Sequence, residues 1–333
     1  MRDTSGVELH SSSVKAAHIT APDRVDVVDT EPPTLEIDHA IVRPQLISIC
    51  GSDLRVLHAM PEGEYPRKIG ESGHEVIGVV EEVEYRSRIA FPLRAGDRVL
   101  GAIYPHIAMA ERFMTSPANL FPVPDIPAEE MVMAQPLATV ISGAQRLSPV
   151  NARSAVVIGQ GGLGLLWNSV LRRMGARRIV ALDLSAERRA VAERYGATHT
   201  VDGGDPDAVA QAREALGGAE ADVVIEACGE PEAINMCGAL VRAHGEVMFF
   251  GIPKRESFDY GFLQLYRKQP TVLFSSVGGP AMFSMAINLI AMGDYDVSGI
   301  ITHRFPLDRV ADAYETAYRR SDGAVRVAIE LQR

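Results

Sequence analysis

The stretch Ala155-Val-Val-Ile-Gly-Gln-Gly-Gly-Leu-Gly164 decides the fold of this chain. An apolar, β-branched run leads directly into the pattern G-x-G-x-x-G, and a helical pattern follows without a break. The glycines have a physical reason, because the backbone must touch a phosphate there. Gly159 allows the tight turn out of the strand, Gly161 leaves room for a pyrophosphate, and Gly164 lets the helix pack closely on the sheet.

The residues after this turn favour a binding function over a chance cluster of glycines. Gly162 and Leu163 begin the expected helix, whose N-terminus offers unpaired N–H groups and a positive dipole end to an anion. Gly175 lies where the helix has to end. The apolar residues of the helix recur at i, i+3 and i+4, as packing on a sheet requires. They are Leu163, Leu166, Trp167, Val170, Leu171 and Met174.

The next predicted strand carries an acidic residue at its end. Residues 178–183 form an apolar run that ends at Asp183, 19 residues after Gly164. The dinucleotide-binding fingerprint places at about this distance the carboxylate that binds the adenosine ribose. Because a carboxylate repels a 2′-phosphate, Asp183 favours NAD over NADP. Arg188 and Arg189 follow in the next helix and leave NADP open as the alternative.

Length and composition limit the classes of protein to consider. The chain has 333 residues, enough for about two domains, with 47% hydrophobic and 23% charged residues. A net charge of −10 argues against a nucleic-acid partner, and no apolar run is long enough to span a membrane. The three cysteines are too few and too scattered for a disulfide framework, and Met1–Ser13 lacks the apolar core of a signal peptide. We therefore expect a cytoplasmic protein.

The pattern of the chain changes near residue 150. Before it, short β-like runs broken by Pro and Gly predict a compact, mostly antiparallel barrel-like domain. These runs are 25–28, 40–42, 46–49, 76–80 and 98–100. From Ala155 onward, strands alternate with helices, which predicts an α/β fold with a doubly wound parallel sheet of six strands. The predicted strands are 155–159, 178–183, 198–201, 222–227, 246–252 and 271–276.

The last part of the chain is expected to leave the parallel sheet. A helix is predicted over 281–292, residues 305–308 open a second amphipathic helix, and 323–329 form a strand that returns to the first domain. The expected catalytic domain therefore combines 1–150 with 277–333, and the expected dinucleotide-binding domain is 151–276.

Two short segments of the first domain carry residues with metal-binding chemistry. The first is Cys50-Gly-Ser-Asp53 and the second is Gly73-His-Glu75, whose His74 lies 24 residues after Cys50. Cys and His are good zinc ligands, and a carboxylate beside the His can supply another donor. From the residues alone, a buried packing cysteine and a structural histidine remain the alternatives.

The sequence resembles the zinc-dependent medium-chain alcohol dehydrogenase family, and its sorbitol and threonine dehydrogenase-like branch more than its liver alcohol dehydrogenase branch. The matching motifs are Cys50–Asp53, Gly73–Glu75, Val76–Val80, Gly96–Val99, Gly159–Gly164, Asp222–Gly229 and Gly245–Gly251. The likeness covers nearly the whole chain, from about residue 14 to 333. It implies a GroES-like β-barrel catalytic domain beside a doubly wound Rossmann domain.

By this resemblance the two segments form a catalytic centre. Cys50 and His74 correspond to ligands of a catalytic zinc, with Glu75 beside them as a ligand or an exchangeable donor. Ser52 matches the hydroxyl that passes the alcohol proton away from the metal, and Asp53 matches the carboxylate that orients the zinc-bound histidine. The residues alone leave open that Ser52 and Asp53 only cap a turn or a helix.

Two features depart from the family pattern. Thr139 matches a residue that contacts the nicotinamide ring, but the family's other zinc ligand, four residues before it, falls on Gln135. An amide oxygen binds zinc more weakly than a thiolate or a carboxylate, so Glu75 or water completes the ligand set, or the zinc is weakly held or lost. Residues 100–110 contain no cysteine where many relatives carry a four-cysteine structural zinc. We expect one catalytic zinc and no structural zinc.

Several other residues are weaker candidates for the site. His106 and His58 are expected to face solvent. The alternatives are that His106 lines the cleft and that His58 approaches the substrate. Cys228 and Cys237 are expected to be packing residues of the cofactor domain. Glu226 either approaches the cofactor or ends a strand that faces water.

The resemblance implies an NAD-dependent oxidoreductase that transfers hydride between a secondary alcohol and the cofactor. The substrate would be a polyol, sugar, cyclitol or amino alcohol, and zinc would act as a Lewis acid on its oxygen. Two other functions stay open: a zinc-free reductase of ketones or quinones that uses NAD(P)H, and a non-catalytic NAD-binding protein. The family's quaternary structure implies a homodimer or homotetramer formed through cofactor-domain strands.

Overall fold

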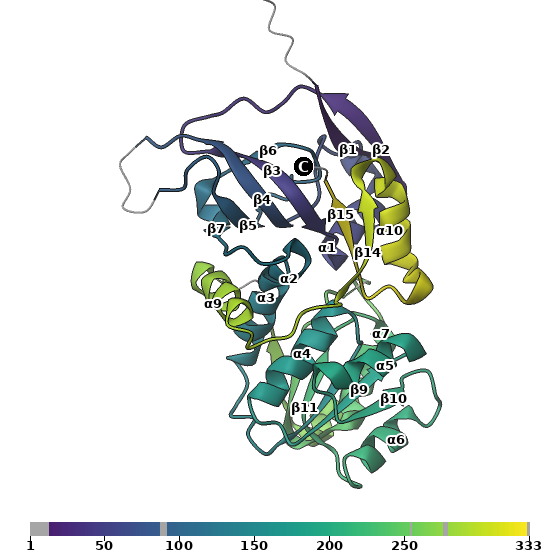
Figure 1. Cartoon of the computed structure of the whole chain (residues 1–333). Helices are drawn as coiled ribbons and strands as arrows, with labels where there is room; N and C mark the ends of the chain where they lie inside the picture. The colour runs from purple at the N-terminus through teal and green to yellow at the C-terminus, as the bar shows by residue number, and fades with distance from the viewer. Residues whose placement is uncertain (1–12, 87–91, 254, 276–278, 332–333) are drawn as a thin grey trace, which may run out of the picture.

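The computed structural model describes residues 13–86, 92–253, 255–275 and 279–331. Two large β-sheets divide the chain into an upper and a lower part in Figure 1. The segment Met1–Ser13, in which no signal peptide is expected, lies almost entirely outside the described residues. The expected domain boundary between 276 and 277 also lies outside them. Among the described helices, none is both long enough and apolar enough to cross a membrane.

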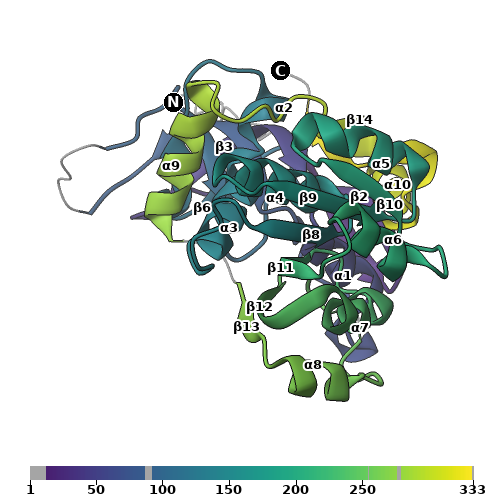
Figure 2. The ribbon, with the colours of Figure 1, turned by 90° about the horizontal axis from the view of Figure 1, so that it is seen from below.

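The lower sheet is the expected parallel sheet of six strands. Its strands lie in the order β10-β9-β8-β11-β12-β13, and every neighbouring pair is parallel. The chain order reverses between β8 and β11, which is where doubly wound folds bind their ligands. Figure 2 shows β13 at one end of this sheet and β10 at the other. The strands are β8 (Ser154–Ile158), β9 (Arg178–Asp183), β10 (His199–Asp202), β11 (Ala221–Glu226), β12 (Val241–Phe249) and β13 (Thr271–Phe274).

Alternation along the strands explains why helices cover both faces of this sheet. Successive side chains of a strand point to opposite faces, so Ala155 and Val157 join one apolar core while Val156 and Ile158 join another. The first core also takes residues of α3, α4 and α5, and the second takes residues of α6, α7 and α8. These helices are α3 (Ala134–Ala144), α4 (Gly162–Arg173), α5 (Ala186–Ala192), α6 (Ala208–Ala215), α7 (Pro231–Leu240) and α8 (Phe262–Lys268).

The upper sheet is mixed and belongs to the barrel-like part of the chain. Its strands lie in the order β14-β15-β3-β4-β5-β7, with β6 also paired to β3, while β1 and β2 form a separate antiparallel pair. A third apolar core lies on this part of the chain. The strands are β1 (Val14–Ala21), β2 (Arg24–Thr30), β3 (Ala40–Ser48), β4 (Glu75–Val83), β5 (Arg98–Ala102), β6 (Phe113–Thr115), β7 (Leu120–Pro122), β14 (Ile301–Pro306) and β15 (Arg326–Glu330).

Two runs that the sequence pattern separates belong to one strand. Residues 40–42 and 46–49 were expected as two strands, whereas β3 continues from the first into the second. Its pairing with β4 shifts register between Pro44 and Leu46. Proline has no N–H to donate to a neighbouring strand, which explains the break in the pattern.

The expectation for the segment around residue 305 also needs correction. Residues 305–308 were expected to open a helix, but β14 runs to Pro306. The helical part begins only afterwards, with η4 (Leu307–Arg309) followed by α10 (Val310–Arg319). The pattern missed β14 because its side chains alternate between buried or half-buried and exposed over only a few residues.

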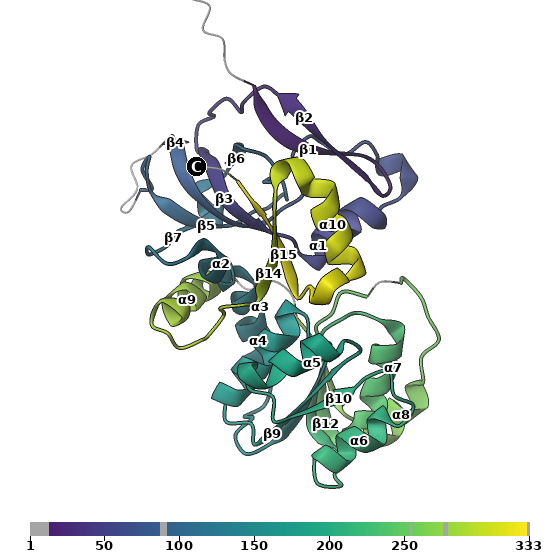
Figure 3. The same ribbon diagram turned by 45° about the vertical axis from the view of Figure 1, so that its right-hand side comes forward.

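The C-terminal strand returns to the upper sheet, as expected. β15 pairs with β3 in antiparallel register, with Ala328 opposite Ser48. α1 (Gly51–His58) follows β3 almost directly, and Figure 3 shows α10 beside it. α9 (Pro280–Ala291) instead packs on α3, between the two sheets in Figure 1. Segments from both ends of the sequence therefore meet where β3 ends.

Candidate active site

The segment that begins at Cys50 carries a buried carboxylate. Cys50 immediately precedes α1, and its N–H donates a 2.8 Å hydrogen bond to Oδ2 of Asp53. Asp53 is 0% exposed, and an acidic residue in the first turn is favoured by the positive end of the helix dipole. Asp53 therefore does cap this helix, but its second oxygen faces groups outside the helix.

A tight loop before β4 brings further donors to the Asp53 carboxylate. Gly73 has a φ of +75°, and its N–H donates to Asp53 Oδ1 at 2.8 Å. The Ser72 hydroxyl donates to the same oxygen at 3.1 Å. His74 comes next, and its Nδ1 lies 3.5 Å from Asp53 Oδ1, the distance of an ion pair rather than of a well-formed hydrogen bond. The carboxylate thus fixes which edge of the His74 ring faces the interior.

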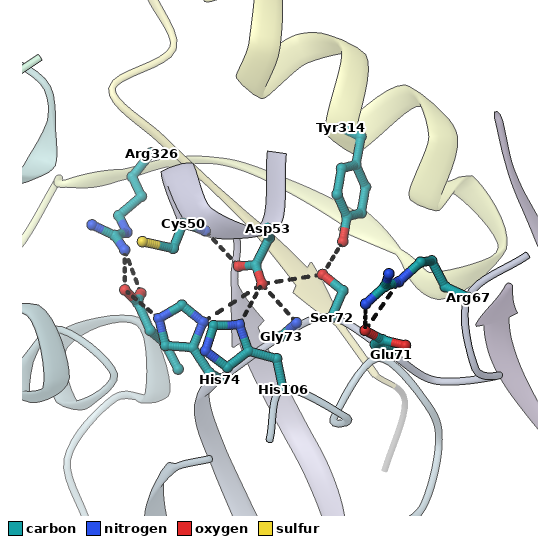
Figure 4. A network of polar contacts seen from close by, with 11 residues as sticks. Cys50, Asp53, Arg67, Glu71, Ser72, Gly73, His74, His106, Tyr314 and Arg326 are labelled. Carbon is teal, nitrogen blue, oxygen red and sulfur yellow. Dashed lines mark hydrogen bonds and ion pairs between the residues drawn. The ribbon is translucent and has the colours of Figure 1, made fainter. Parts of the chain in front are cut away.

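The opposite edge of the His74 ring faces two other potential metal ligands. Its Nε2 lies 3.9 Å from Oε1 of Glu75. The ligand atoms of Cys50, His74 and Glu75 all lie within 4.8 Å of one another, and Figure 4 shows the Cys50 thiol directed toward the same space. A thiol and an imidazole that are far apart in the sequence therefore converge, together with a carboxylate, on a volume that one ion could fill.

Burial and charge together set the protonation of this cluster. Burial by itself would raise the pKa of Asp53, but the positive charge of His74 and the hydrogen bonds that the carboxylate accepts lower it to about 2. Burial would lower the pKa of His74, whereas the charge of Asp53 and its contact with Cys50 raise it well above its usual value. Because Asp53 Oδ1 lies beside Nδ1 of His74, it favours a proton on that nitrogen, and Nε2 faces Glu75.

Arg326 is a member of the site that the sequence did not reveal. Its guanidinium group pairs with both carboxylate oxygens of Glu75, and its Nε donates to Ser48 Oγ at 2.7 Å. Burial would lower the pKa of Arg326, but the charge of Glu75 raises it. The only sequence signal at this position is the predicted strand 323–329, which cannot tell that Arg326 reaches a residue 251 positions away.

His106 also lies in the site, so the expectation that it faces solvent is wrong. Its ring stacks on the ring of His74 with centroids 4.0 Å apart, and its Nδ1 lies 3.9 Å from Asp53 Oδ1. The side chain is 29% exposed. Burial and the neighbouring charge of His74 lower the pKa of His106. His106 lies in the segment 100–110, which by the resemblance corresponds to the structural-zinc lobe that this sequence lacks.

The remaining weaker candidates lie outside the cluster. His58 contacts Asp23 at 2.6 Å and stacks on Tyr318, and its side chain is mostly buried, so the expectation of a solvent-facing residue is wrong for it too. Cys237 is buried in the core, as expected. Glu226 does not face water, because it is buried and accepts the N–H groups of Cys228 and Gly229 in the loop after β11.

Three further predicted site residues lie on the helices α1 and α3. Ser52, in the first turn of α1, has a buried Oγ with no hydrogen-bond partner among the described residues. Thr139 on α3 donates from its hydroxyl to the carbonyl of Pro136 at 2.7 Å. Gln135, on the same helix, is buried. The orphaned hydroxyl of Ser52 is the group among these that still needs a partner.

The glycine-rich turn has a different reason for each glycine. Gly159 has a φ of +92°, and a Cβ on Gly164 would lie 1.8 Å from the Gly159 carbonyl oxygen, so both glycines are required by the turn itself. A Cβ on Gly161 would meet only Nη1 of Arg188, at 3.9 Å. A Cβ on Gly162 would press against Arg326 at 3.2 Å. Gly161 is therefore the glycine of this turn that no contact within the protein requires, and the space beside it is open to a ligand.

Asp183 holds this turn in place from the end of β9. Its Oδ2 accepts the N–H of Gln160 at 2.6 Å, and its Oδ1 accepts the N–H of Ser185 at 2.9 Å. The two arginines that kept NADP open also lie close to this turn, because Nη1 of Arg188 is the nearest group to a Cβ on Gly161 and Nη1 of Arg189 donates to the Asp183 carbonyl at 2.8 Å. Arg188 is buried and donates to the Ala324 carbonyl, and Arg189 pairs with Asp202 at 3.1 Å.

Comparisons with known proteins identify the family of this chain. A family model described as "Alcohol dehydrogenase GroES-like domain" matches residues 36–125, and one described as "Zinc-binding dehydrogenase" matches residues 162–292. An alcohol dehydrogenase from Cupriavidus necator is 25% identical over 374 aligned positions, which cover 96% of this chain and 99% of the relative. The L-galactonate-5-dehydrogenase of Escherichia coli (strain K12) is 27% identical and covers 84% of this chain and 87% of its own.

A solved structure extends the likeness to three dimensions. A zinc-binding dehydrogenase from Sinorhizobium meliloti 1021, bound to NADP, superposes with a TM-score of 0.83 at 25% identity, covering 96% of this chain and 99% of that one. The fold and the family matches define an oxidoreductase of the alcohol dehydrogenase class. The chain belongs to the zinc-dependent medium-chain alcohol dehydrogenase family, with a GroES-like part and a Rossmann part.

The buried pair of Arg326 and Glu75 predicts a large effect on stability. Arg326→Met leaves the Glu75 carboxylate buried without a counter-charge, so we expect the free energy of unfolding to fall by about 3–5 kcal/mol. The double variant Arg326→Met with Glu75→Gln should recover part of this loss, because the uncompensated charge is gone. Denaturant unfolding of the three proteins measures both effects. A single variant within about 0.5 kcal/mol of the wild type would show that the pair contributes little.

Proposed function

We propose that this protein oxidises a secondary hydroxyl of a small polyhydroxylated substrate with NAD, at a centre that holds one zinc ion. The observation that carries the proposal is the convergence of Cys50, His74 and Glu75 within 4.8 Å. A thiolate, an imidazole and a carboxylate are the donors that zinc prefers, and three protein ligands leave a position for the substrate. When bound, the zinc supplies a Lewis acid and the nicotinamide ring accepts the hydride.

The other side chains of the site prepare this centre. Asp53 keeps the proton of His74 on Nδ1, so that Nε2 presents its lone pair. Arg326 balances the charge of the buried Glu75 carboxylate. Ser52 has a buried hydroxyl without a partner among the described residues, and it would relay the substrate proton by accepting it while its own hydroxyl proton passes outward to solvent. Gln135 is not needed as a ligand, and the absence of cysteine from 100–110 supports a single zinc.

The cofactor would be held by the turn from Gly159 to Gly164 and by Asp183. Gly161 offers the open backbone for the pyrophosphate, with Gly162 and Leu163 at the start of α4 supplying N–H groups. Asp183 already accepts two backbone N–H groups, and its remaining lone pairs suit the ribose hydroxyls rather than a phosphate. Thr139 would lie toward the nicotinamide ring. NAD is therefore proposed, although the Sinorhizobium relative binds NADP.

The substrate class is drawn from the relatives. The name of the L-galactonate-5-dehydrogenase describes oxidation of one hydroxyl of a polyhydroxylated acid. We extend this to a polyol, sugar, cyclitol or amino alcohol. A zinc ion held by Cys50, His74 and Glu75 would bind one hydroxyl oxygen of such a substrate, and other residues of the site would bind its neighbouring polar groups. The scattered cysteines favour a cytoplasmic protein.

The edge of the parallel sheet supports a homodimer or homotetramer. β13 is the last strand of that sheet, and its Phe274 is 62% exposed. α8, next to it along the chain, exposes Phe262, Leu263 and Tyr266. An unpaired strand edge beside exposed apolar side chains favours pairing with a second copy of the chain.

Metal content and turnover test the function together. The wild type should bind about one zinc per chain and oxidise members of a polyol and sugar panel with NAD. Cys50→Ala should lose the zinc and nearly all activity, whereas the control Cys237→Ala, in the core, should keep its zinc. Full activity without metal would favour a zinc-free reductase. Cofactor binding without turnover across the panel would favour a non-catalytic protein.

The choice of cofactor depends on one carboxylate. Asp183→Ser removes its charge and its hydrogen bonds to the ribose, so we expect affinity for NADH to fall about tenfold or more relative to NADPH. Asp205→Ser is the control, because Asp205 lies in the loop after β10 and its carboxylate accepts the N–H of Asp207. Fluorescence titration with both cofactors measures the ratio. An unchanged ratio in Asp183→Ser would remove this residue from the ribose site.

The proposed subunit contact can be broken by charge. Phe274→Glu places a carboxylate on the exposed edge of β13 and should shift the sedimenting species to the mass of one chain, because an unpaired charge in an interface is costly. The control is Met292→Glu, at an exposed apolar residue just after α9. A wild-type protein that sediments as a monomer would refute the proposed assembly.

A further inference from the structure

A buried chain of polar groups connects the C-terminal helix with the metal-ligand cluster. The Tyr314 hydroxyl, on α10, forms a hydrogen bond with Ser72 Oγ, and Ser72 in turn contacts Asp53 Oδ1. Asp53 Oδ1 faces Nδ1 of His74. Tyr314, Ser72 and Asp53 are all at most 1% exposed, and Figure 4 shows them in a row that ends at the His74 ring.

The Asp53 carboxylate, at the end of this row of polar groups, determines the direction of each hydrogen bond in the row. The carboxylate of Asp53 is ionised and can only accept, so the Ser72 hydroxyl must donate to it. The Ser72 oxygen is then free to accept from the Tyr314 hydroxyl, whose pKa is raised by burial and which therefore keeps its proton. Every hydroxyl proton in the chain thus points toward Asp53.

The backbone at Ser72 is held in an uncommon conformation. Its φ is +124°, a region that L-residues rarely adopt. The Ser72 N–H donates to the His106 carbonyl, and the Ser72 carbonyl accepts from Ala108 and Met109. The surrounding chain therefore maintains a strained residue at the point where its hydroxyl can join Tyr314 to Asp53.

We propose that Tyr314 is a positioning residue for the metal centre, acting through Ser72 and Asp53 on the orientation of the His74 ring. The inference rests on the proposed function, because it needs His74 to be a metal ligand. Partners that orient a metal-bound histidine typically change metal affinity or activity by about 10- to 100-fold when removed. Tyr314 reaches this role from a helix 240 residues further along the chain than His74.

Cobalt binding to the metal-free full-length protein tests this inference. Tyr314→Phe removes only the hydroxyl and should weaken the affinity for Co²⁺ about tenfold or more, with a change in the visible spectrum of the bound ion. Tyr318→Phe is the matched control, one turn later on the same helix, where the ring stacks on His58. Its cobalt affinity and spectrum should equal those of the wild type.

A double variant shows whether Tyr314 acts through Ser72. Ser72→Ala should weaken cobalt binding at least as much as Tyr314→Phe, and the double variant should lose no more than Ser72→Ala alone. Additive losses would overturn the proposed route. Equal cobalt affinity and spectrum in Tyr314→Phe and the wild type, with only a lower unfolding temperature of the metal-free protein, would mean that Tyr314 is merely structural.

Failure of the inference and failure of the proposed function give different results. If the wild type binds no cobalt that depends on Cys50, as Cys50→Ala would reveal, both the zinc centre and the positioning role fall. If the wild type binds cobalt at Cys50 and Tyr314→Phe binds it equally well, only the role of Tyr314 falls. Weaker binding in Tyr314→Phe alone, with Tyr318→Phe unchanged, supports the inference.

Discussion

The site depends on one carboxylate that has no access to water. A buried carboxylate must have its oxygens satisfied, because an unpaired buried charge is strongly destabilising. Asp53 meets this requirement by accepting the N–H groups of Cys50 and Gly73 and the hydroxyl of Ser72. These bonds tie the start of α1 to the loop before β4. The thiol of Cys50 and the ring of His74 are brought together as a result, since each is part of one of the two segments that Asp53 joins.

The two halves of the protein are joined at the same place by arginines that extend in opposite directions. Arg326, on a strand of the upper sheet, lies against Gly162 in the cofactor turn while it pairs with Glu75. Arg188, on a helix of the lower half, donates to the Ala324 carbonyl near the start of that strand. The metal-ligand cluster and the proposed pyrophosphate position are therefore connected by contacts of a few ångströms. A substitution at Gly162 in the glycine-rich turn is therefore expected to displace Arg326 and so to alter its pairing with Glu75.

The sequence predicts local features of this site well and long-range contacts poorly. The turn from Gly159 to Gly164 and its partner Asp183 are readable because strand, turn and carboxylate have a fixed spacing. The meeting of Cys50 with His74 came from resemblance, because spacing alone does not bring them together. Arg326 escaped prediction since nothing local marks it as a partner of Glu75, and His106 was misplaced because its loop follows no regular pattern. These contacts depend on which strands pair, a property of the whole sheet.

The position of β15 has a consequence for how the protein is made. All six strands of the parallel sheet precede it, so a nascent chain can complete that half while the last strand is still inside the ribosome. The upper half has to wait, because Glu75 lacks its counter-charge until Arg326 has emerged. Synthesis therefore delivers the six strands of the nucleotide-binding part first and leaves the catalytic half open until its final strand inserts beside β3.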